Sequence, residues 1–179
     1  MRKITPASDN LVFFDAEFTS LEFEKSRLLS FGAVKLSGEE FYCEFAQSRE
    51  TLETASDWVK ENILPGLTAE KVSLSQAREQ IARFIGPNKP YLVTYIYKYD
   101  AYHWYKLFGY DDHLTERIIL DFASMLFAIG INPECHSAAD RDGFLATLGI
   151  DATGYRKHCA LADARILREA YLRLSEKVK

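Results

Sequence analysis

Two acidic residues separated by one position, Asp15 and Glu17, come at the end of an apolar run typical of a buried strand. Side chains alternate across a strand, so these two carboxylates are expected on the same face. Neighbouring carboxylates repel, and each raises the pKa of the other. A hard divalent cation removes that cost, because it takes oxygen ligands and brings positive charge. The pair is therefore a candidate site for Mg²⁺ or Mn²⁺, and the alternative is a solvated strand end with two surface acids.

Three later residues could complete such a site. Asp100 follows a predicted strand and starts a predicted helix, where an aspartate is commonly just an N-cap. Asp163 lies in the first turns of the last predicted helix, where an acid also interacts well with the helix dipole. His158 lies five residues before Asp163, although a lone histidine is more often a surface or hydrogen-bonded residue than a catalyst. Each residue alone has a plain structural explanation, so only their order and spacing together indicate a site.

The hydrophobic pattern predicts the elements that would position these residues. Strands are expected at residues 11–16, 27–36, 40–46, 91–97 and 118–120. Helices are expected at residues 51–62, 73–85, 100–108, 122–129, 140–148 and 157–174. A short Ser37-Gly38 turn joins the second and third strands as a hairpin. Hairpin pairing followed by strands separated by helices predicts an α/β fold with a mixed sheet covered by helices.

The composition predicts a single domain over residues 1–179. The chain is 47% hydrophobic and 13% aromatic, which is enough to fill a core. No stretch approaches the roughly 20 apolar residues that cross a bilayer, and the N-terminus lacks the apolar core of a signal peptide. Three cysteines without a CxxC pair argue against a disulfide framework or zinc ribbon and favour a reducing cytosol. We therefore expect a cytoplasmic location and no membrane partner.

The formal net charge of −4 restricts the kind of nucleic-acid partner. A protein that follows duplex nucleic acid along its phosphates usually carries a basic excess. Carboxylates grouped around cations would add to the negative count, so charge alone does not exclude a nucleic-acid enzyme. The balance favours a short contact with a strand end over a long phosphate-binding groove.

Taken together, the acids and the histidine resemble a known family. Asp15-x-Glu17, Asp100 and His158-Cys-Ala-Leu-Ala-Asp163-Ala follow one another as in the DEDD superfamily of 3′–5′ exonucleases, histidine branch (DEDDh). The resemblance covers nearly the whole chain, and the Leu-Ser-Phe-Gly-Ala-Val segment at 29–34 also looks like the family's second strand. It implies a ribonuclease H-like α/β fold, in which a mixed β-sheet is flanked by α-helices.

The resemblance also implies a two-metal hydrolase. Asp15, Glu17, Asp100 and Asp163 would hold two Mg²⁺ or Mn²⁺ ions about 4 Å apart. One cation would lower the pKa of the attacking water, and the other would stabilise the departing 3′-oxygen. His158 would accept the proton of that water, because its pKa lies near working pH.

Phe18 and Thr19 directly follow the paired acids and are the expected substrate-binding residues. An aromatic ring there could stack on a terminal base or sugar, as in single-strand binders, whereas the alternative is that Phe18 packs into the core. The chain departs from many relatives at Ile96 and Tyr99, where they have Asn and Phe, and after Glu17, where they often have Thr-Thr-Gly. These differences bear on the substrate and not on the metal ligands.

The expected function is a metal-dependent 3′–5′ exonuclease that releases nucleoside monophosphates from the 3′ end of single-stranded RNA. The ribonuclease AS and ribonuclease T-like exoribonucleases look most similar. The alternatives are a DNA proofreading or repair exonuclease, with single-stranded DNA as substrate, and a catalytically weak nucleic-acid-binding module on the same fold. His136 and Asp140 form a pair with a spacing one residue too short, so they are not expected to be catalytic. The sequence itself does not give the oligomeric state, but relatives of this size are often homodimers, so a homodimer is one candidate assembly.

Overall fold

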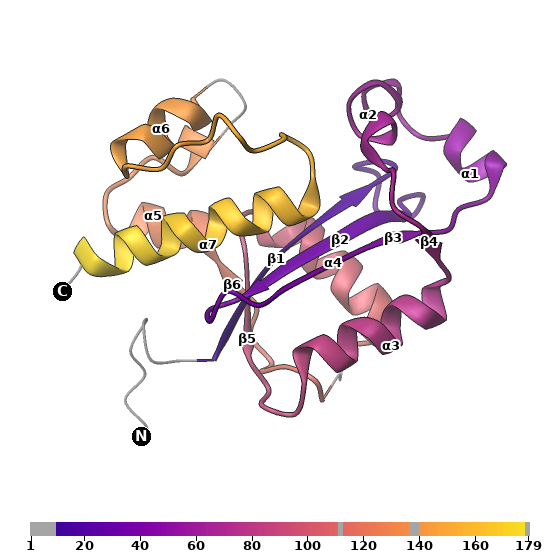
Figure 1. Cartoon of the computed structure of the whole chain (residues 1–179), viewed down its shortest axis with the longest axis horizontal. Helices are drawn as coiled ribbons and strands as arrows, with labels where there is room; N and C mark the ends of the chain where they lie inside the picture. Colours follow the sequence, from indigo (N-terminus) through magenta and orange to yellow (C-terminus); the bar gives the residue numbers. More distant parts are fainter. Residues whose placement is uncertain (1–9, 111–112, 137–139, 178–179) are drawn as a thin grey trace.

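Six strands form one mixed sheet in the order β4-β3-β2-β1-β5-β6 (Figure 1). The structure is a computed structural model that describes residues 10–110, 113–136 and 140–177. Its strands are β1 (Leu11–Phe18), β2 (Leu28–Lys35), β3 (Glu40–Phe45), β4 (Lys71–Val72), β5 (Tyr91–Thr94) and β6 (Leu120–Asp121). β2 runs antiparallel to β1 and β3, and the other neighbouring pairs are parallel. β1 therefore lies inside the sheet, paired on both edges.

Helices cover both faces of this sheet. They are α1 (Arg49–Glu53), α2 (Asp57–Asn62), α3 (Leu74–Ile85), α4 (Tyr97–Phe108), α5 (Phe122–Ala128), α6 (Arg141–Thr147) and α7 (Ala160–Lys177), with 3₁₀ turns η1 (Leu64–Gly66) and η2 (Pro133–His136). α3 and α4 pack on the face that receives Phe14, and α5, α6 and α7 pack on the face that receives Phe13. Figure 1 shows α3 and α7 on opposite sides of the sheet. Because side chains alternate along β1, Asp15 and Glu17 point to the same face as Phe13, beneath α7. The predicted mixed sheet covered by helices is confirmed.

The three cysteines, Cys43, Cys135 and Cys159, are free in the structure. Among the described helices, none combines the length and the apolar character needed to span a bilayer.

β1 is longer than predicted. It continues to Phe18, beyond the expected end at residue 16, because it remains paired with β2 as far as Leu28. The register shifts between Glu17 and Phe18, which marks a bulge where the strand ends. Asp15 and Glu17 therefore lie in a part of β1 that stays paired with β2, opposite Gly32 and Ser30, and beyond the last residue that pairs with β5.

The segment around Asp100 also differs from the prediction. β-branched and aromatic residues favoured a strand over 91–97, but β5 ends at Thr94 and α4 begins at Tyr97. Asp100 consequently lies inside the first turn of α4, while Ile96 occupies the N-cap position without a side-chain hydrogen bond. The N-cap explanation for Asp100 is therefore wrong.

Three further differences concern helices and an edge strand. The predicted helix 51–62 is divided into α1 and α2, because Ser48 and Ser56 each accept a hydrogen bond from a backbone N–H and begin a separate helix. β4 was not predicted, since two residues are too few to show an alternating pattern. The last helix begins at Ala160 instead of 157, so His158 precedes α7 and does not belong to it.

The start of α7 lies directly against β2 at Gly32. A Cβ atom at this position would come within 2.2 Å of the backbone nitrogen of Leu161 and 2.3 Å of the carbonyl carbon of Ala160. Backbone atoms at such a distance cannot move aside as a flexible side chain could. The absent side chain of Gly32 therefore allows the helix that carries Asp163 to approach the sheet.

We expect Gly32→Ala to destabilise the fold by about 1–3 kcal/mol or more, because the added methyl group must push α7 away from β2. Urea unfolding followed by circular dichroism measures this change. Gly143→Ala in α6 is the matched control, since no atom lies within 4 Å of the new Cβ and alanine is the better helix former, by about 0.5–1 kcal/mol. Equal unfolding midpoints for the two variants would show that the contact at Gly32 does not fix α7.

Candidate active site

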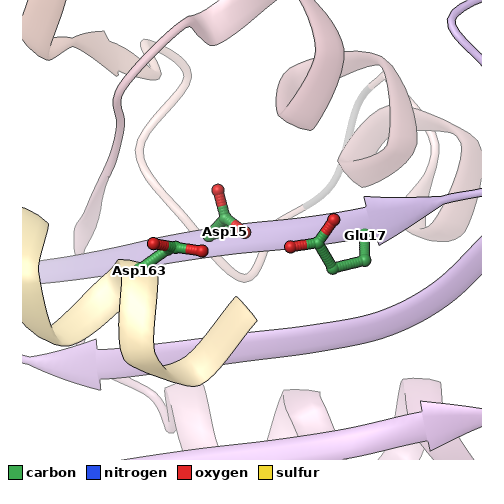
Figure 2. A group of neighbouring side chains, drawn as sticks. All are labelled: Asp15, Glu17 and Asp163. Atoms are coloured by element: carbon green, nitrogen blue, oxygen red, sulfur yellow. The ribbon is translucent and has the colours of Figure 1, made fainter. Parts of the chain in front are cut away.

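Three carboxylates from two elements meet in one place. Asp15 and Glu17 of β1 and Asp163 of α7 each offer an oxygen, and these oxygens all lie within 4.8 Å of one another. Figure 2 shows Asp15 and Glu17 along β1, with Asp163 of α7 next to Asp15. We call these residues the three-acid cluster. The alternation along β1 and the close contact of α7 at Gly32 bring them together.

Asp100 reaches the same strand from α4. Its Oδ1 accepts a hydrogen bond from the backbone N–H of Ala16, at 3.1 Å, and its Oδ2 accepts one from the hydroxyl group of Thr94. Ala16 stands between Asp15 and Glu17, so the Asp100 side chain is held against β1 between the two strand acids. The structure therefore brings all four predicted acids to one site. Asp100 is not one of the three residues whose oxygens all lie within 4.8 Å of one another.

A cleft of about 340 Å³ opens over these acids. Its lining contains all four carboxylates, and also Phe18, Tyr95, Ile96, Tyr99, Arg141, Lys157 and His158. The volume is at the low end of the range for small-ligand sites. The lining of the cleft therefore combines four carboxylates, several aromatic rings and three basic side chains.

Burial and mutual repulsion make the acids hard to ionise. Burial raises the pKa of Glu17 to about 8, and the charges of Asp163 and Asp100 add to the effect. Burial raises the pKa of Asp100 to about 7 and also raises the pKa of Asp15 and Asp163 above the ordinary aspartate value. A group of buried carboxylates needs positive charge to remain ionised at neutral pH. Oxygen donors in this arrangement fit a hard divalent cation such as Mg²⁺ or Mn²⁺.

His158 borders the cleft from the segment before α7. Its backbone has a φ of 58°, a left-handed conformation that is uncommon for residues other than glycine. The imidazole ring packs edge-on against Trp58 of α2, with the ring centroids 4.7 Å apart and an interplanar angle of 87°. Burial lowers the pKa of His158 below 6.5, while the charge of Asp163 opposes the shift. The ring is therefore neutral near pH 7 and able to accept a proton.

The two predicted substrate-binding residues have different environments. Phe18 lines the cleft, and its ring stacks on the buried ring of His103 with centroids 4.8 Å apart. Phe18 is thus partly a packing residue and partly a wall of the cleft. Thr19 is only 3% exposed, and its hydroxyl oxygen accepts a hydrogen bond from the backbone N–H of Arg27. The side chain of Thr19 therefore supports the loop after β1, and its position gives no support to a substrate contact.

A family comparison decides what kind of protein carries this site. The model of the RNase T family, described as an exonuclease family, matches residues 12–171. The chain belongs to this exonuclease family. The match includes all four acids and His158, so the whole cleft lies within the family domain.

Solved exonucleases share the fold of this family member at low sequence identity. A 3′-exonuclease, from a study of 3′-end specific recognition of the histone mRNA stem-loop, aligns with a TM-score of 0.67 and 17% identity, over 98% of this chain and 67% of that one. A full-length 3′-exonuclease aligns with a TM-score of 0.66 and 17% identity, over 94% and 83%. E. coli exonuclease I in complex with a dT13 oligonucleotide aligns with a TM-score of 0.64 and 14% identity, over 93% of this chain but only 41% of that enzyme. The search of curated protein sequences found no match.

Two contacts of the exonuclease site were not predicted from the sequence. Arg141 of α6 lies in the cleft beside Asp163, with Nη2 of the guanidinium 2.6 Å from Oδ1 of the carboxylate. The sequence did contain an indication of this burial. Phe144, Leu145 and Leu148 form an apolar stripe at helical spacing, and Arg141 occupies the first position of that stripe, where an apolar residue is expected. No sequence pattern indicated the contact between Trp58 and His158, because nothing in the sequence joins α2 to the segment before α7.

The raised pKa values predict how the stability of the exonuclease depends on pH. An acid whose pKa is raised in the folded state binds a proton more tightly there than in the unfolded chain, so the folded state loses stability as the pH rises. For Glu17, this loss is expected between pH 4.5 and about pH 8. In the presence of a chelator, we expect the unfolding temperature to fall over this range. Mg²⁺ or Mn²⁺ should raise the unfolding temperature, and should do so more at mildly alkaline than at mildly acidic pH, because protons compete with the cation.

Glu17→Gln tests the cause of this pH dependence. With the chelator, the variant should be more stable than wild type at mildly alkaline pH by several degrees, since one pKa unit is worth about 1.4 kcal/mol and each kcal/mol shifts the unfolding temperature by about 2–4 °C. It should also lose most of the stabilisation by cations. Glu24→Gln, at an exposed acid outside the cleft, is the control and should behave as wild type. A wild-type unfolding temperature that stays constant from pH 4.5 to 8 would contradict the predicted repulsion.

Proposed function

We propose that the chain is a metal-dependent 3′–5′ exonuclease of the histidine branch, which removes nucleoside monophosphates from the 3′ end of single-stranded RNA. The observation that carries this proposal is the meeting of the three-acid cluster, Asp100 and His158 at one cleft in a member of an exonuclease family. The order of these residues and the His158–Asp163 spacing are those expected for the histidine branch.

Each step of phosphodiester hydrolysis has a candidate group in this cleft. Asp15, Glu17, Asp100 and Asp163 are the residues that would hold divalent cations. Bound cations would lower the pKa of the attacking water and stabilise the charge on the departing 3′-oxygen. His158 would accept the proton of the water at an imidazole nitrogen, because burial keeps its ring neutral near pH 7. The charge of Asp163 would then stabilise the imidazolium.

The size and walls of the cleft support attack at a strand end. A volume of about 340 Å³ suits one terminal nucleotide better than a duplex. The rings of Phe18 and Tyr99 lie 5.8 Å apart with a tilt of 31°, and both line the cleft. Aromatic faces of this kind can stack on a base or sugar. The net charge of −4 also disfavours a long groove that follows phosphates.

The preference for RNA rests on the Asp-x-Glu-Phe and Tyr-Asp motifs, which look most like those of the ribonuclease AS and ribonuclease T-like exoribonucleases. Single-stranded DNA is the second candidate substrate, because the similar exonuclease I of E. coli has been solved with a dT13 oligonucleotide. We place the enzyme with the exoribonucleases on the motifs, and the test compares both substrates directly.

The experiment uses 5′-labelled single strands of RNA and DNA with the same sequence, together with a circular single strand. With Mg²⁺ or Mn²⁺, the linear RNA should shorten in single-nucleotide steps and a terminal 3′-phosphate should slow the reaction. The circular strand should remain intact. Faster shortening of the DNA would reverse the substrate assignment, and rapid cutting of the circle would contradict an exonuclease.

A further inference from the structure

Arg141 is a buried cation inside a cleft of carboxylates. Its side chain is 7% exposed, and arginine is almost never fully buried unless it is paired. It lies on the apolar stripe of α6, whose other members Phe144, Leu145 and Leu148 pack in the core. Removing a guanidinium from water costs several kcal/mol, which an apolar residue at the same position would avoid. This cost indicates that the positive charge of Arg141 interacts with charged groups in the cleft.

The ion pair with Asp163 uses only part of the guanidinium. Nη2 of Arg141 lies 2.6 Å from Oδ1 of Asp163, and a guanidinium carries five N–H donors in a planar fork. Within the part of the chain that the structure describes, the buried Nε atom of Arg141 has no hydrogen-bond partner. An unpaired buried donor is unfavourable, so a ligand that enters the cleft and accepts from Arg141 would gain a charge-assisted hydrogen bond.

The charges of the cleft indicate the chemistry of that ligand. If four carboxylates hold two divalent cations, as the proposed function requires, their charges cancel and Arg141 leaves one positive charge. A phosphodiester group carries one negative charge, and its paired oxygens match the fork of a guanidinium. Lys157 also borders the cleft, but it is 42% exposed and pairs with Asp142 at 3.0 Å. Arg141 is therefore the better-placed cation for a phosphate.

We propose that Arg141 binds the scissile phosphate of the substrate through guanidinium N–H groups that Asp163 leaves free. This inference rests on the proposed function, because it requires a phosphodiester in the cleft. The competing explanation is that Arg141 is only a counter-ion of Asp163. In that case, removing Arg141 should change the affinity for the divalent cation and should leave the affinity for the nucleic acid unchanged when the cation is saturating.

The test measures equilibrium binding of a fluorescent single-stranded RNA in the His158→Ala background, where the strand is consumed slowly, at saturating Mn²⁺. Arg141→Met should weaken binding by about 10- to 100-fold, the loss expected for one hydrogen-bonded charge. The slope of the logarithm of affinity against the logarithm of salt concentration should also fall by about 0.7–1, the value for one lost phosphate contact. A purely structural role would not change this slope.

Matched variants separate the phosphate contact from general effects. Arg165→Met removes another paired arginine. Arg165 lies on α7 outside the cleft, with its Nε 2.7 Å from Oε1 of Glu40 on β3, so this variant should bind RNA as wild type does. Arg141→Gln keeps an amide that can donate to Asp163, so it protects the test against a Met variant that fails to fold. It should show the same loss of affinity and salt slope as Arg141→Met.

Unchanged affinity and salt slope in a folded Arg141 variant would overturn the inference, while strand shortening by the wild-type chain would leave the proposed function standing. A wild-type chain that neither binds nor shortens the RNA and DNA strands would overturn both proposals. The two failures are therefore distinguishable in one set of measurements.

Discussion

Replacing Asp163 with asparagine is expected to reduce the single-turnover rate of nucleotide release by roughly 10³-fold or more. Asparagine keeps the shape of the side chain but removes the charge that a cation requires, and bound metal ions supply several kcal/mol of transition-state stabilisation. One carboxylate oxygen of Asp163 pairs with Arg141 and the other accepts from the backbone N–H of Cys159 at 3.3 Å, so the variant should still fold. Calorimetric titration with Mn²⁺ should show weakened binding in parallel with the lost rate.

The control for this prediction is Asp151→Asn. Asp151 is exposed, and its carboxylate accepts hydrogen bonds from Thr153 outside the acidic cleft. This variant should keep the wild-type rate and the wild-type Mn²⁺ isotherm. A normal rate for Asp163→Asn with intact Mn²⁺ binding would mean that the three-acid cluster does not hold the catalytic cation.

His158→Ala is expected to lower the rate by roughly 10²–10⁴-fold, the range typical for the loss of a general base. Unlike Asp163→Asn, it should leave cation and oligonucleotide binding nearly unchanged, because the imidazole moves a proton and does not hold the cation. The wild-type rate should fall as pH drops below 6.5, where the imidazole takes up a proton, and the variant should lack this dependence at saturating cation. Rapid-quench measurements across the pH range provide both quantities.

His136→Ala is the matched control for the histidine assignment. The structure places His136 at the end of η2, and α6 lies between it and α7 along the chain. His136 and Asp140 therefore do not lie at the start of the last helix, where His158 and Asp163 lie. This variant should retain the wild-type rate and pH dependence. An inactive His136→Ala together with an active His158→Ala would show that the motif has been misplaced along the chain.

Local rules predicted where three of the acids lie on their elements, and the family resemblance predicted that these acids meet. The alternation of β1 puts Asp15 and Glu17 on one face, and the apolar spacing of the last helix puts Asp163 near its start. Both rules depend only on neighbouring residues, and the structure agrees with each of them. The mixed sheet was also predicted from local patterns, namely one tight turn and the later alternation of strands with helices.

Contacts between distant segments could not be predicted. The hydrogen bond from the backbone N–H of Ala16 to Asp100 joins residues 84 positions apart and explains the role of Asp100 better than its place in a helix does. The left-handed φ of His158 and its contact with Trp58 depend on how α2 meets the segment before α7. Arg141 was missed because the stripe of α6 predicts only burial, and not the partner that a buried charge would find.

The most direct test is single-turnover release of the 3′-terminal nucleotide from a single strand by wild-type protein, with and without a divalent cation. We expect release in Mg²⁺ or Mn²⁺, none after chelation, and recovery when the cation is restored, because the buried carboxylates of this cleft need the cation to act. Nucleotide release that continues at full rate in the chelator would contradict a metal-dependent exonuclease centre at Asp15, Glu17, Asp100 and Asp163.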